Sequence, residues 1–390
     1  MMADSGDDSP DKKTRFAFVG AGLIAGKNAV AIHTCPRTEL VFVGARNVEK
    51  AQAFCAQYNV PAFGTMEEAC TNDSVDAVYL CIPTAARLPW IFRAIEAGKH
   101  VIVEKPVAPT VADTQQIVKA AKEANVIYMD GTMWRQATRT QYLYDLLHEQ
   151  KKLGQVLHVN TSFSTASPIA VFEAGSRGQP DIEPLGAVGD LAWYALGVIA
   201  FGLDDNNDDD TPLFPITVRA TTQNTPTTNS SYHSCGFLEF PGGRTATFDS
   251  GFKLALRQTV EFVCEKGVVR MNDFVNPPDN SIDSFSGPSI AKPTRFTLLD
   301  DSAGTGVIVT GDTEVVELPT TTNNDDNEGN LQVVRYVHEV EMFDNFARAC
   351  QEQKQNPVWM RSSLATMALV EGVIASAAQN GAAIVVNSPF

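Results

Sequence analysis

A glycine-rich turn near the start of this chain could bind the phosphates of a dinucleotide. The stretch Arg15-Phe-Ala-Phe-Val-Gly-Ala-Gly-Leu-Ile-Ala25 joins an apolar run to a helical pattern. Gly20 permits a tight turn, Gly22 lets the backbone approach a pyrophosphate, and Ala25 stands where this motif often has a third glycine. The first helical amides would then face the phosphates. A turn that binds no ligand can have the same spacing, but the strand and helix patterns that follow favour the dinucleotide.

A lysine follows the apolar run at residues 100–103, and its side chain could take part in chemistry. The run ends abruptly in Glu104-Lys105-Pro106. A lysine after a buried strand commonly marks only the point where the chain meets solvent. Here the lysine lies beside the predicted cofactor cleft, so Lys105 is a candidate catalytic residue. Pro106 fixes the local backbone, and a Lys-Pro peptide can be cis at modest cost.

A third group, Gly186-Ala-Val-Gly-Asp190-Leu-Ala-Trp-Tyr194, combines an acid with a phenol. If residues 190–201 form a helix, Asp190 and Tyr194 lie one turn apart on the same face. An acid also suits the first turn of a helix. The pair could then perform acid–base chemistry. The alternative is a core helix on which Asp190 is only an N-cap and the aromatic side chains only pack.

The first third of the chain alternates strand-like and helical patterns, which predicts a parallel sheet covered by helices. Ligands of such sheets bind at the carboxyl ends of the strands, where the glycine turn and Lys105 fall. Gly98 is predicted to cap one of the helices. The expected strands are Phe16–Gly20, Leu40–Gly44, Ala77–Ile82, His100–Glu104 and Val126–Met129, and the expected helices are 51–58, 88–97 and Thr110–Ala124.

After about residue 150 alternating apolar residues predict an antiparallel sheet. Its expected strands include Val156–Phe163, Gly236–Phe240 and Thr259–Cys264, and two late helices are expected at Val333–Gln353 and Ser362–Asn380. The α/β chain is therefore predicted to have three parts. These are a disordered acidic tail over residues 1–14, a Rossmann domain with a doubly wound parallel sheet over 15–135, and a C-terminal α+β domain with a large, open, mainly antiparallel sheet over 136–390.

The composition excludes some classes of partner. The 390 residues carry a net charge of −16, concentrated in the tail and in polar inserts near 204–211 and 320–330. A nucleic-acid groove would need a basic surface, so we expect a small-molecule substrate and no nucleic acid. The longest apolar run, Leu191–Leu203, is shorter than the roughly 20 residues that span a bilayer, so no membrane partner is expected.

The cysteines indicate a reducing compartment. The 7 cysteines form no Cys-x-x-Cys pair, and several lie among apolar neighbours, as small buried residues do. No basic-then-apolar leader opens the sequence. We therefore expect a cytoplasmic protein, and we expect no metal site.

The end of the second strand bears on the choice of cofactor. NAD-binding sites usually place an acid there to bind the ribose hydroxyls. This chain has Ala45-Arg46-Asn47 instead, with Lys50 one helical turn later. Arg46 could bind a 2′-phosphate, which favours NADP with NAD as the alternative. Arg46 could also be no more than a solvated residue at the start of a helix.

These motifs together resemble the family of glucose–fructose oxidoreductase, inositol dehydrogenase and MocA, over nearly the whole chain after residue 14. The resemblance is carried by Gly-x-Gly-x-x-Ala from Gly20, by Glu104-Lys-Pro, and by Gly186-x-x-Gly-Asp-x-x-x-Tyr194. Gly131-Thr-Met-Trp134 is most similar to dimeric dihydrodiol dehydrogenases and NADP-linked D-xylose 1-dehydrogenases. The family resemblance implies an NAD(P)-dependent dehydrogenase that acts on CH–OH groups. It also implies a homodimer or homotetramer that forms through the open sheet.

The resemblance also implies the residues of the site. The implied catalytic residues are Lys105, Asp190 and Tyr194. The implied cofactor-binding residues are Gly20, Gly22, Leu23, Ile24, Ala45, Arg46, Lys50, Ile82, Pro83, Thr84, Glu104, Lys105, Trp134 and Arg135. The implied substrate-binding residues are Lys105, Phe163, Arg177, Asp190 and Tyr194.

The implied reaction moves a hydride between the nicotinamide and a secondary or anomeric hydroxyl of a sugar, polyol or cyclic diol. Tyr194 would be the acid or base, and a free tyrosine has a pKa of about 10. We expect Lys105 to favour the phenolate and to polarise the substrate oxygen, while Asp190 orients the substrate or the lysine.

Departures from the family pattern leave other functions open. Thr84-Ala-Ala-Arg87 replaces the frequent Asn-x-x-His, and the segment after the fifth strand, Asp130–Thr138, lacks a frequent proline. One alternative is a catalytically silent regulator that binds dinucleotide. Another is a redox-neutral enzyme that processes glycosides with a tightly bound NAD(P).

Overall fold

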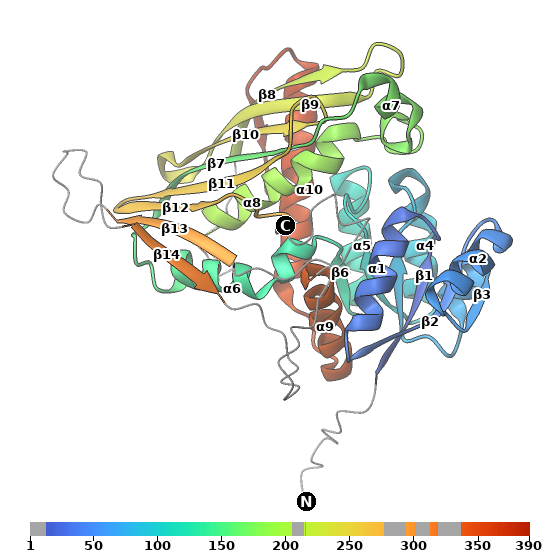
Figure 1. Cartoon of the computed structure of the whole chain (residues 1–390). Coiled ribbons are helices and arrows are strands. Elements are labelled where there is room, and N and C mark those ends of the chain that lie inside the picture. Colours follow the sequence, from blue (N-terminus) through green and yellow to red (C-terminus); the bar gives the residue numbers. More distant parts are fainter. Residues whose placement is uncertain (1–12, 205–213, 215, 277–293, 301–312, 319–336) are drawn as a thin grey trace, which may run out of the picture.

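Two sheets, joined by helices, form the framework of the chain (Figure 1). The computed structural model describes residues 13–204, 214, 216–276, 294–300, 313–318 and 337–390. The predicted acidic tail therefore lies almost wholly outside the described residues, as do most of the predicted polar inserts. The predicted α/β class with two different sheets is confirmed.

The N-terminal sheet is parallel throughout and has six strands in the order β3-β2-β1-β4-β5-β6. All five predicted strands are present, and the three-residue β3 was too short to show a pattern. The strands are β1 (Thr14–Val19), β2 (Thr38–Gly44), β3 (Ala62–Gly64), β4 (Ala77–Leu80), β5 (His100–Val103) and β6 (Tyr128–Asp130). The connecting helices are α1 (Leu23–Thr34), α2 (Val48–Tyr58), α3 (Met66–Thr71), α4 (Thr84–Glu96) and α5 (Val111–Glu123).

The order of these strands positions the candidate cofactor site. β1 pairs with β2 on one side and with β4 on the other, so the chain reverses its direction of winding at β1. Helix α1 packs against α2, whereas α4 packs against α3 and α5, which places a helical layer on each face. Such sheets bind ligands in the crevice beyond the carboxyl ends of the strands at this reversal. β1 and β4 reach that edge at Gly20 and Ile82.

The C-terminal sheet has nine strands in the order β14-β13-β12-β11-β7-β10-β9-β8-β15. All its neighbours are antiparallel except β7 and β10, so the predicted mainly antiparallel sheet is confirmed. The strands are β7 (Val156–Ser164), β8 (Ile216–Asn224), β9 (Ser231–Glu239), β10 (Thr245–Gly251), β11 (Arg257–Cys264), β12 (Gly267–Met271), β13 (Thr294–Asp300), β14 (Thr313–Leu318) and β15 (Ile384–Val386).

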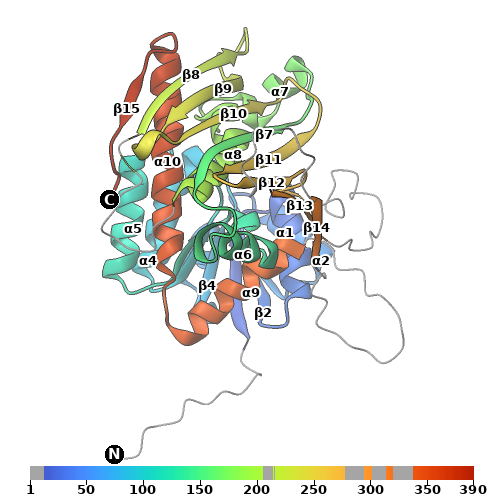
Figure 2. The ribbon, with the colours of Figure 1, turned by 90° about the vertical axis from the view of Figure 1, so that its left-hand side faces the viewer.

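Two apolar helices fill the space beside the large sheet. α8 (Trp193–Leu203) is buried on nearly every side and packs against β7 and against α10 (Pro357–Ala378). α10 also contacts β8, α5 and β6, so this one helix touches both sheets (Figure 2). α10 is long and apolar enough to cross a membrane, but its most apolar window is 72% buried inside the fold, as a core helix is.

The helices predicted at 51–58 and 88–97 begin earlier, at Val48 and Thr84, and three further helices also differ from their predictions. The helix expected from Asp190 is preceded by a π-helical turn, η4 (Val188–Ala192), which holds Asp190 before α8 begins. The last helix begins at Pro357 because Asn356 caps it, five residues before its expected start at Ser362. The helix expected from Val333 is described from Val337, as α9 (Val337–Glu352), and residues 333–336 lie outside the described part.

Helix α9 returns the end of the chain to the N-terminal sheet. Its Phe343 ring lies 5.5 Å from Phe16, 5.7 Å from Tyr79 and 6.3 Å from Phe18, measured between centroids. These rings close one face of the strands that carry the candidate cofactor site. The domain boundary at residues 135 and 136 stays a prediction, because helices from the end of the chain pack on both sheets.

Candidate active site

The glycine turn after β1 has the shape that a pyrophosphate needs. Gly20 has a φ of +119°, and a Cβ there would lie 3.0 Å from Ile82 and 3.1 Å from the carbonyl oxygen of Cys81, so only glycine fits. At Gly22 a Cβ would meet no atom within 4 Å, which leaves open space beside the backbone. No side chain caps the first turn of α1, and Leu23 and Ile24 are exposed. The first amides of α1 are thus open to an anion, and a dinucleotide fits here.

The end of β2 presents one basic side chain to the same edge. Arg46 is exposed and follows Ala45, which is buried beneath it. Asn47 caps α2 by accepting a hydrogen bond from the amide of Lys50 at 2.7 Å. Arg46 is therefore at the end of the strand and before the helix, where a 2′-phosphate could reach it.

The start of α4 is held by the C-terminal domain. The Thr84 hydroxyl donates to Glu183 at 2.6 Å, and the Thr84 amide donates to the same carboxylate at 3.3 Å. The amide of Ala85 donates to the carbonyl oxygen of Ile182 at 3.2 Å. Pro83 provides no side-chain cap for α4. Ile182 and Glu183 of the C-terminal domain instead accept hydrogen bonds from the first two amides of the helix. Thr84, predicted to bind cofactor, has its hydroxyl on Glu183 instead.

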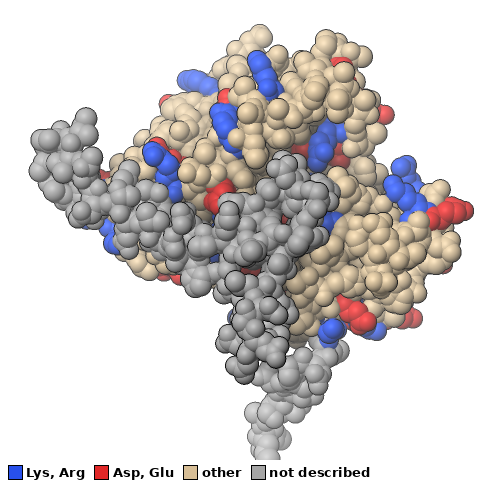
Figure 3. Space-filling model, in the orientation of Figure 1, with Lys and Arg blue, Asp and Glu red and all other residues tan. Residues whose placement is uncertain are grey.

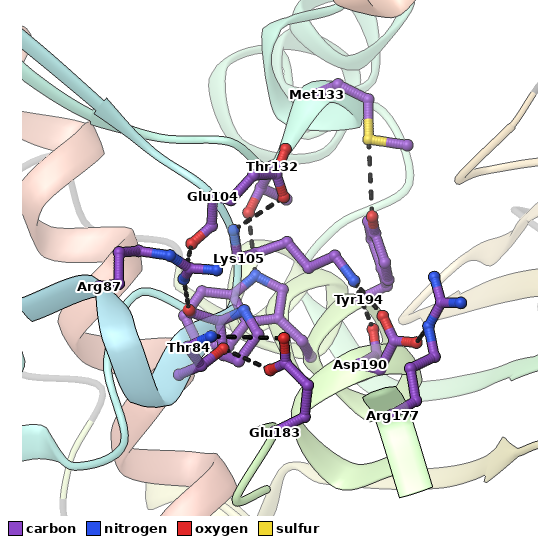
Figure 4. A network of polar contacts seen from close by, with 12 residues as sticks. Thr84, Arg87, Glu104, Lys105, Thr132, Met133, Arg177, Glu183, Asp190 and Tyr194 are labelled. Atoms are coloured by element: carbon purple, nitrogen blue, oxygen red, sulfur yellow. Dashed lines mark hydrogen bonds and ion pairs between the residues drawn. The ribbon is translucent and has the colours of Figure 1, made fainter. Parts of the chain in front are cut away.

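Lys105, Asp190 and Arg177 form one ion-paired cluster (Figure 4). The Lys105 ammonium, at the end of β5, donates to Asp190 Oδ1 and, at 3.0 Å, to the Asp190 carbonyl oxygen. Arg177, from the turn η3 (Ser176–Gly178), contacts Asp190 Oδ2 at 2.5 Å. Burial alone would raise the pKa of Asp190, but the two cations hold it well below its ordinary value. Asp190 is therefore a carboxylate that orients Lys105.

Tyr194 completes the cluster, but its contact with Lys105 is through the ring. The Lys105 ammonium lies 4.8 Å from the ring centroid, a cation–π contact, and the Tyr194 hydroxyl points to Met133 Sδ at 3.8 Å. Phe163, only 6% exposed, packs edge-on against the Tyr194 ring at 5.2 Å. The predicted residues Lys105, Asp190, Tyr194, Phe163 and Arg177 are thus together, with Phe163 behind the tyrosine.

The expected effect of Lys105 on the tyrosine is wrong for this state. Burial raises the pKa of Tyr194 well above its ordinary value, and the carboxylates of Glu104, Asp190 and Glu339 raise it further. The Arg177 guanidinium lowers the pKa of Tyr194 only in part. Tyr194 is therefore a neutral phenol, ready to donate a proton.

The Glu104 side chain fixes the backbone at Lys105. One carboxylate oxygen accepts the Lys105 amide at 3.0 Å, and the other accepts the Tyr79 hydroxyl at 2.5 Å. The Tyr79 hydroxyl in turn accepts a hydrogen bond from the side-chain amide of Asn28, in α1, at 2.8 Å. This chain of hydrogen bonds links α1, whose N-terminus forms the candidate phosphate site, to the backbone of Lys105. Burial raises the pKa of Glu104, although Lys105 and Tyr79 counteract it.

That Trp134 and Arg135 line the nicotinamide cleft stays a prediction, and the structure gives both side chains contacts with other parts of the fold. Trp134 is 2% exposed and packs against Phe201 and Phe274 between the sheets. The Arg135 guanidinium donates to the carbonyl oxygen of Gly197 in α8 at 2.6 Å. Both side chains thus support α8 from behind.

Their neighbours Thr132 and Met133 reach the site instead. Thr132 accepts a hydrogen bond from the Trp193 indole at 2.9 Å, and Met133 contacts Tyr194. Met133 opens the turn η1 (Met133–Gln136), and no sequence pattern gave the direction in which each of its side chains points. Among the described residues, no cluster of three or more His, Cys, Asp or Glu is arranged to bind a metal.

Family models match both the segment that forms the N-terminal sheet and much of the segment that forms the C-terminal sheet. The model of the oxidoreductase family with an NAD-binding Rossmann fold matches residues 14–132. The model of the GFO/IDH/MocA C-terminal domain matches residues 143–270. The chain belongs to the Gfo/Idh/MocA oxidoreductase family. The predicted family, enzyme class and nicotinamide type of cofactor are confirmed.

Curated members of the Gfo/Idh/MocA family extend the comparison. The chain is 27% identical over 238 residues to D-xylose 1-dehydrogenase (NADP(+)) 2 of Haloferax volcanii, covering 61% of this chain and 69% of that one. It is 24% identical over 302 residues to trans-1,2-dihydrobenzene-1,2-diol dehydrogenase of Xenopus laevis, covering 75% and 86%.

Solved structures share the fold of both domains. A 3-ketoreductase from Actinomadura kijaniata, crystallised with NADP and TDP-benzene, has a TM-score of 0.75 at 20% identity, covering 94% of this chain and 98% of that one. Levoglucosan dehydrogenase in complex with NADH has a TM-score of 0.78 at 15% identity, covering 97% and 100%.

The raised pKa of Tyr194 predicts an alkaline titration without a contribution from this residue. Between about pH 9 and 11 a free tyrosine ionises, but Tyr194 should remain neutral in the folded protein. The tyrosinate absorbance gained over this range should be the same in the wild type and in Tyr194→Phe. Unfolded in guanidinium, the two proteins should differ by one tyrosine of 8. A smaller gain in folded Tyr194→Phe would show that Tyr194 ionises in this range and would contradict the raised pKa.

Proposed function

We propose that this protein is an NADP-linked dehydrogenase that acts on a secondary or anomeric hydroxyl of a sugar, polyol or cyclic diol. The observation that carries the proposal is the contact of Lys105 with both Asp190 and the Tyr194 ring, beyond the carboxyl ends of β1, β4 and β5. A bound nicotinamide would accept or donate the hydride. The pyrophosphate of the same cofactor would be held by the turn at Gly20 and Gly22 and by the first turn of α1.

The proton chemistry falls to Tyr194 and Lys105. Tyr194, as a neutral phenol, donates its proton to the carbonyl oxygen in the reducing direction. In the oxidising direction Tyr194 first loses its proton to solvent, and the phenolate then takes the proton of the substrate hydroxyl. Lys105 has three N–H donors, of which Asp190 accepts two. The third bonds to none of the described residues and can polarise the substrate oxygen. Asp190 holds the ammonium in this orientation.

The charges around the cluster favour a neutral substrate. Lys105 and Arg177 are balanced by Asp190 and by Glu183, whose charge also acts on Arg177. No surplus charge remains in this group to select a phosphate or carboxylate. On the face in Figure 3, the described Lys and Arg side chains are dispersed among acids and form no continuous basic surface. A neutral hydroxylated small molecule therefore suits the site better than nucleic acid.

Arg46 supports NADP as the cofactor. The xylose dehydrogenase relative is NADP-linked, and the 3-ketoreductase was crystallised with NADP, although levoglucosan dehydrogenase was crystallised with NADH. We also propose a cytoplasmic homodimer or homotetramer. The open sheet face that includes Asn160, Arg219 and Thr247 offers a surface for assembly, and 7 free cysteines suit a reducing compartment.

Removing either catalytic group should abolish turnover but not cofactor binding. Lys105→Met and Tyr194→Phe should each lower kcat by about 10²- to 10⁴-fold, the contribution of positioned acid–base groups. The dissociation constant for NADPH, measured by fluorescence, should change little. Lys99→Met and Tyr128→Phe are matched controls, because both side chains are buried and bond elsewhere: Lys99, just before β5, donates to the carbonyl oxygen of Val75, and Tyr128, in β6, donates to Ser363. Full activity of either catalytic variant would overturn the proposal.

Removing the Arg46 guanidinium should weaken NADP selectively. A charge-assisted contact contributes about 1.5–3 kcal/mol, so Arg46→Ala should raise the Kd for NADP roughly 10- to 100-fold. The Kd for NAD should stay the same. Arg93→Ala, which removes an exposed arginine paired with Glu67, is the control. Calorimetry that finds NAD bound as tightly as NADP by the wild type would contradict the assignment.

A further inference from the structure

A buried arginine outside the predicted site binds the backbone on both sides of Lys105. Arg87 lies in the first turn of α4, and it is 3% exposed. Its guanidinium donates to the carbonyl oxygen of Glu104 at 2.5 Å and to that of Pro106. These two residues are the chain neighbours of Lys105, so one planar group holds the peptide before the lysine and the residue after it (Figure 4).

The same guanidinium also holds the end of β4. Its Nε and Nη2 donate to the carbonyl oxygen of Ile82 at 3.0 Å and 2.7 Å. Three carbonyl oxygens from two strand ends thus converge on Arg87. Carbonyls at strand ends lack sheet partners, and a buried polar group left unpaired is costly. Arg87 satisfies them together and fixes the distance between the ends of β4 and β5.

An arginine is required for this geometry. The five donors of a guanidinium form a rigid fork, whereas the ammonium of a lysine is a point charge. Arg87 contacts no carboxylate directly, and its nearest balancing charges are Glu183 and Glu104. Burying this cation is expensive without such partners. The hydrogen bonds of Arg87 to the carbonyl oxygens of Ile82, Glu104 and Pro106 offset part of this desolvation free energy.

We propose that Arg87 is a positioning residue that fixes the backbone at Glu104 and Pro106 and thereby sets where the Lys105 ammonium lies between Asp190 and Tyr194. The inference rests on the proposed function for its effect on turnover, but its effect on Lys105 is independent of any substrate. Arg87 acts through the lysine and contacts neither cofactor nor substrate in this account.

A chemical readout of Lys105 tests the proposal without turnover. Trace acetylation with acetic anhydride, followed by mass spectrometry, reports how accessible each lysine is. In the wild type, Asp190 should protect Lys105. In Arg87→Lys, which keeps the charge but loses the fork, Lys105 acetylation should rise severalfold relative to Lys99. Arg139→Lys is the matched control, because Arg139 is equally buried and binds Asp273 and Phe274 elsewhere. If Arg87→Lys does not fold, Arg87→Gln replaces it.

Kinetics provide the second readout. A displacement of about 1 Å at a reacting group can cost 100-fold in rate, so Arg87→Lys should lower kcat about 10- to 100-fold. The KM for NADP should stay within twofold, and the primary deuterium isotope effect on kcat should increase. Loss of folded protein would lower the rate without changing the isotope effect, in the variant and in Arg139→Lys alike.

The two readouts separate the possible failures. Unchanged acetylation of Lys105 in folded Arg87→Lys or Arg87→Gln would overturn the positioning role, whatever the kinetics. Increased acetylation in a protein whose wild type turns over no sugar or diol would support the role of Arg87 and reject the proposed function.

Discussion

The ion pair between Lys105 and Asp190 is the interaction on which the rest of this site depends. Lys105 comes from the N-terminal sheet and Asp190 from the turn that opens α8 beside the C-terminal sheet. The two domains therefore complete one site together, and breaking such a buried pair typically costs about 3–5 kcal/mol. The pair also leaves one lysine proton for the substrate. The same contact thus contributes to domain docking and to the proposed chemistry.

Each partner of this pair is held by its own domain. On the lysine side, Glu104 binds the Lys105 amide, and Arg87 binds the flanking carbonyl oxygens. On the acid side, Arg177 takes the second oxygen of Asp190. Neither carboxylate oxygen can rotate away without losing a cation. The geometry is therefore set before any ligand arrives, which is the condition for efficient electrostatic catalysis.

The sequence predicted the framework because its signals are local. The apolar run before Gly20, the strand ending at Lys105 and the spacing of Asp190 and Tyr194 reflect strand and helix periods. The π-helical turn at Asp190 breaks that period, so the exact presentation of the acid could not be read. The direction of Met133 rather than Trp134 toward Tyr194 depends on a short turn, η1, that packs against α9 and α6.

Contacts between residues that lie far apart in the chain could not be predicted from the sequence. Glu183 meets Thr84, and Arg87 meets Glu104, only because two strand ends and a loop from the other domain converge. The neutral state of Tyr194 has the same origin, since burial and carboxylates from several segments raise its pKa. A hint existed at Arg87, which replaces a frequent histidine of the family, but its target could not be inferred.

Formation of reduced nicotinamide tests the central claim most directly. Purified protein and NADP would be mixed with aldoses, inositols and cyclic diols, and the absorbance of NADPH followed for each. We predict that at least one neutral polyhydroxy compound gives NADPH in multiple turnovers. Protein that binds NADP but forms no NADPH with any of them would contradict it. That result would favour a silent regulator or, if NAD(P) copurifies tightly bound, a redox-neutral enzyme.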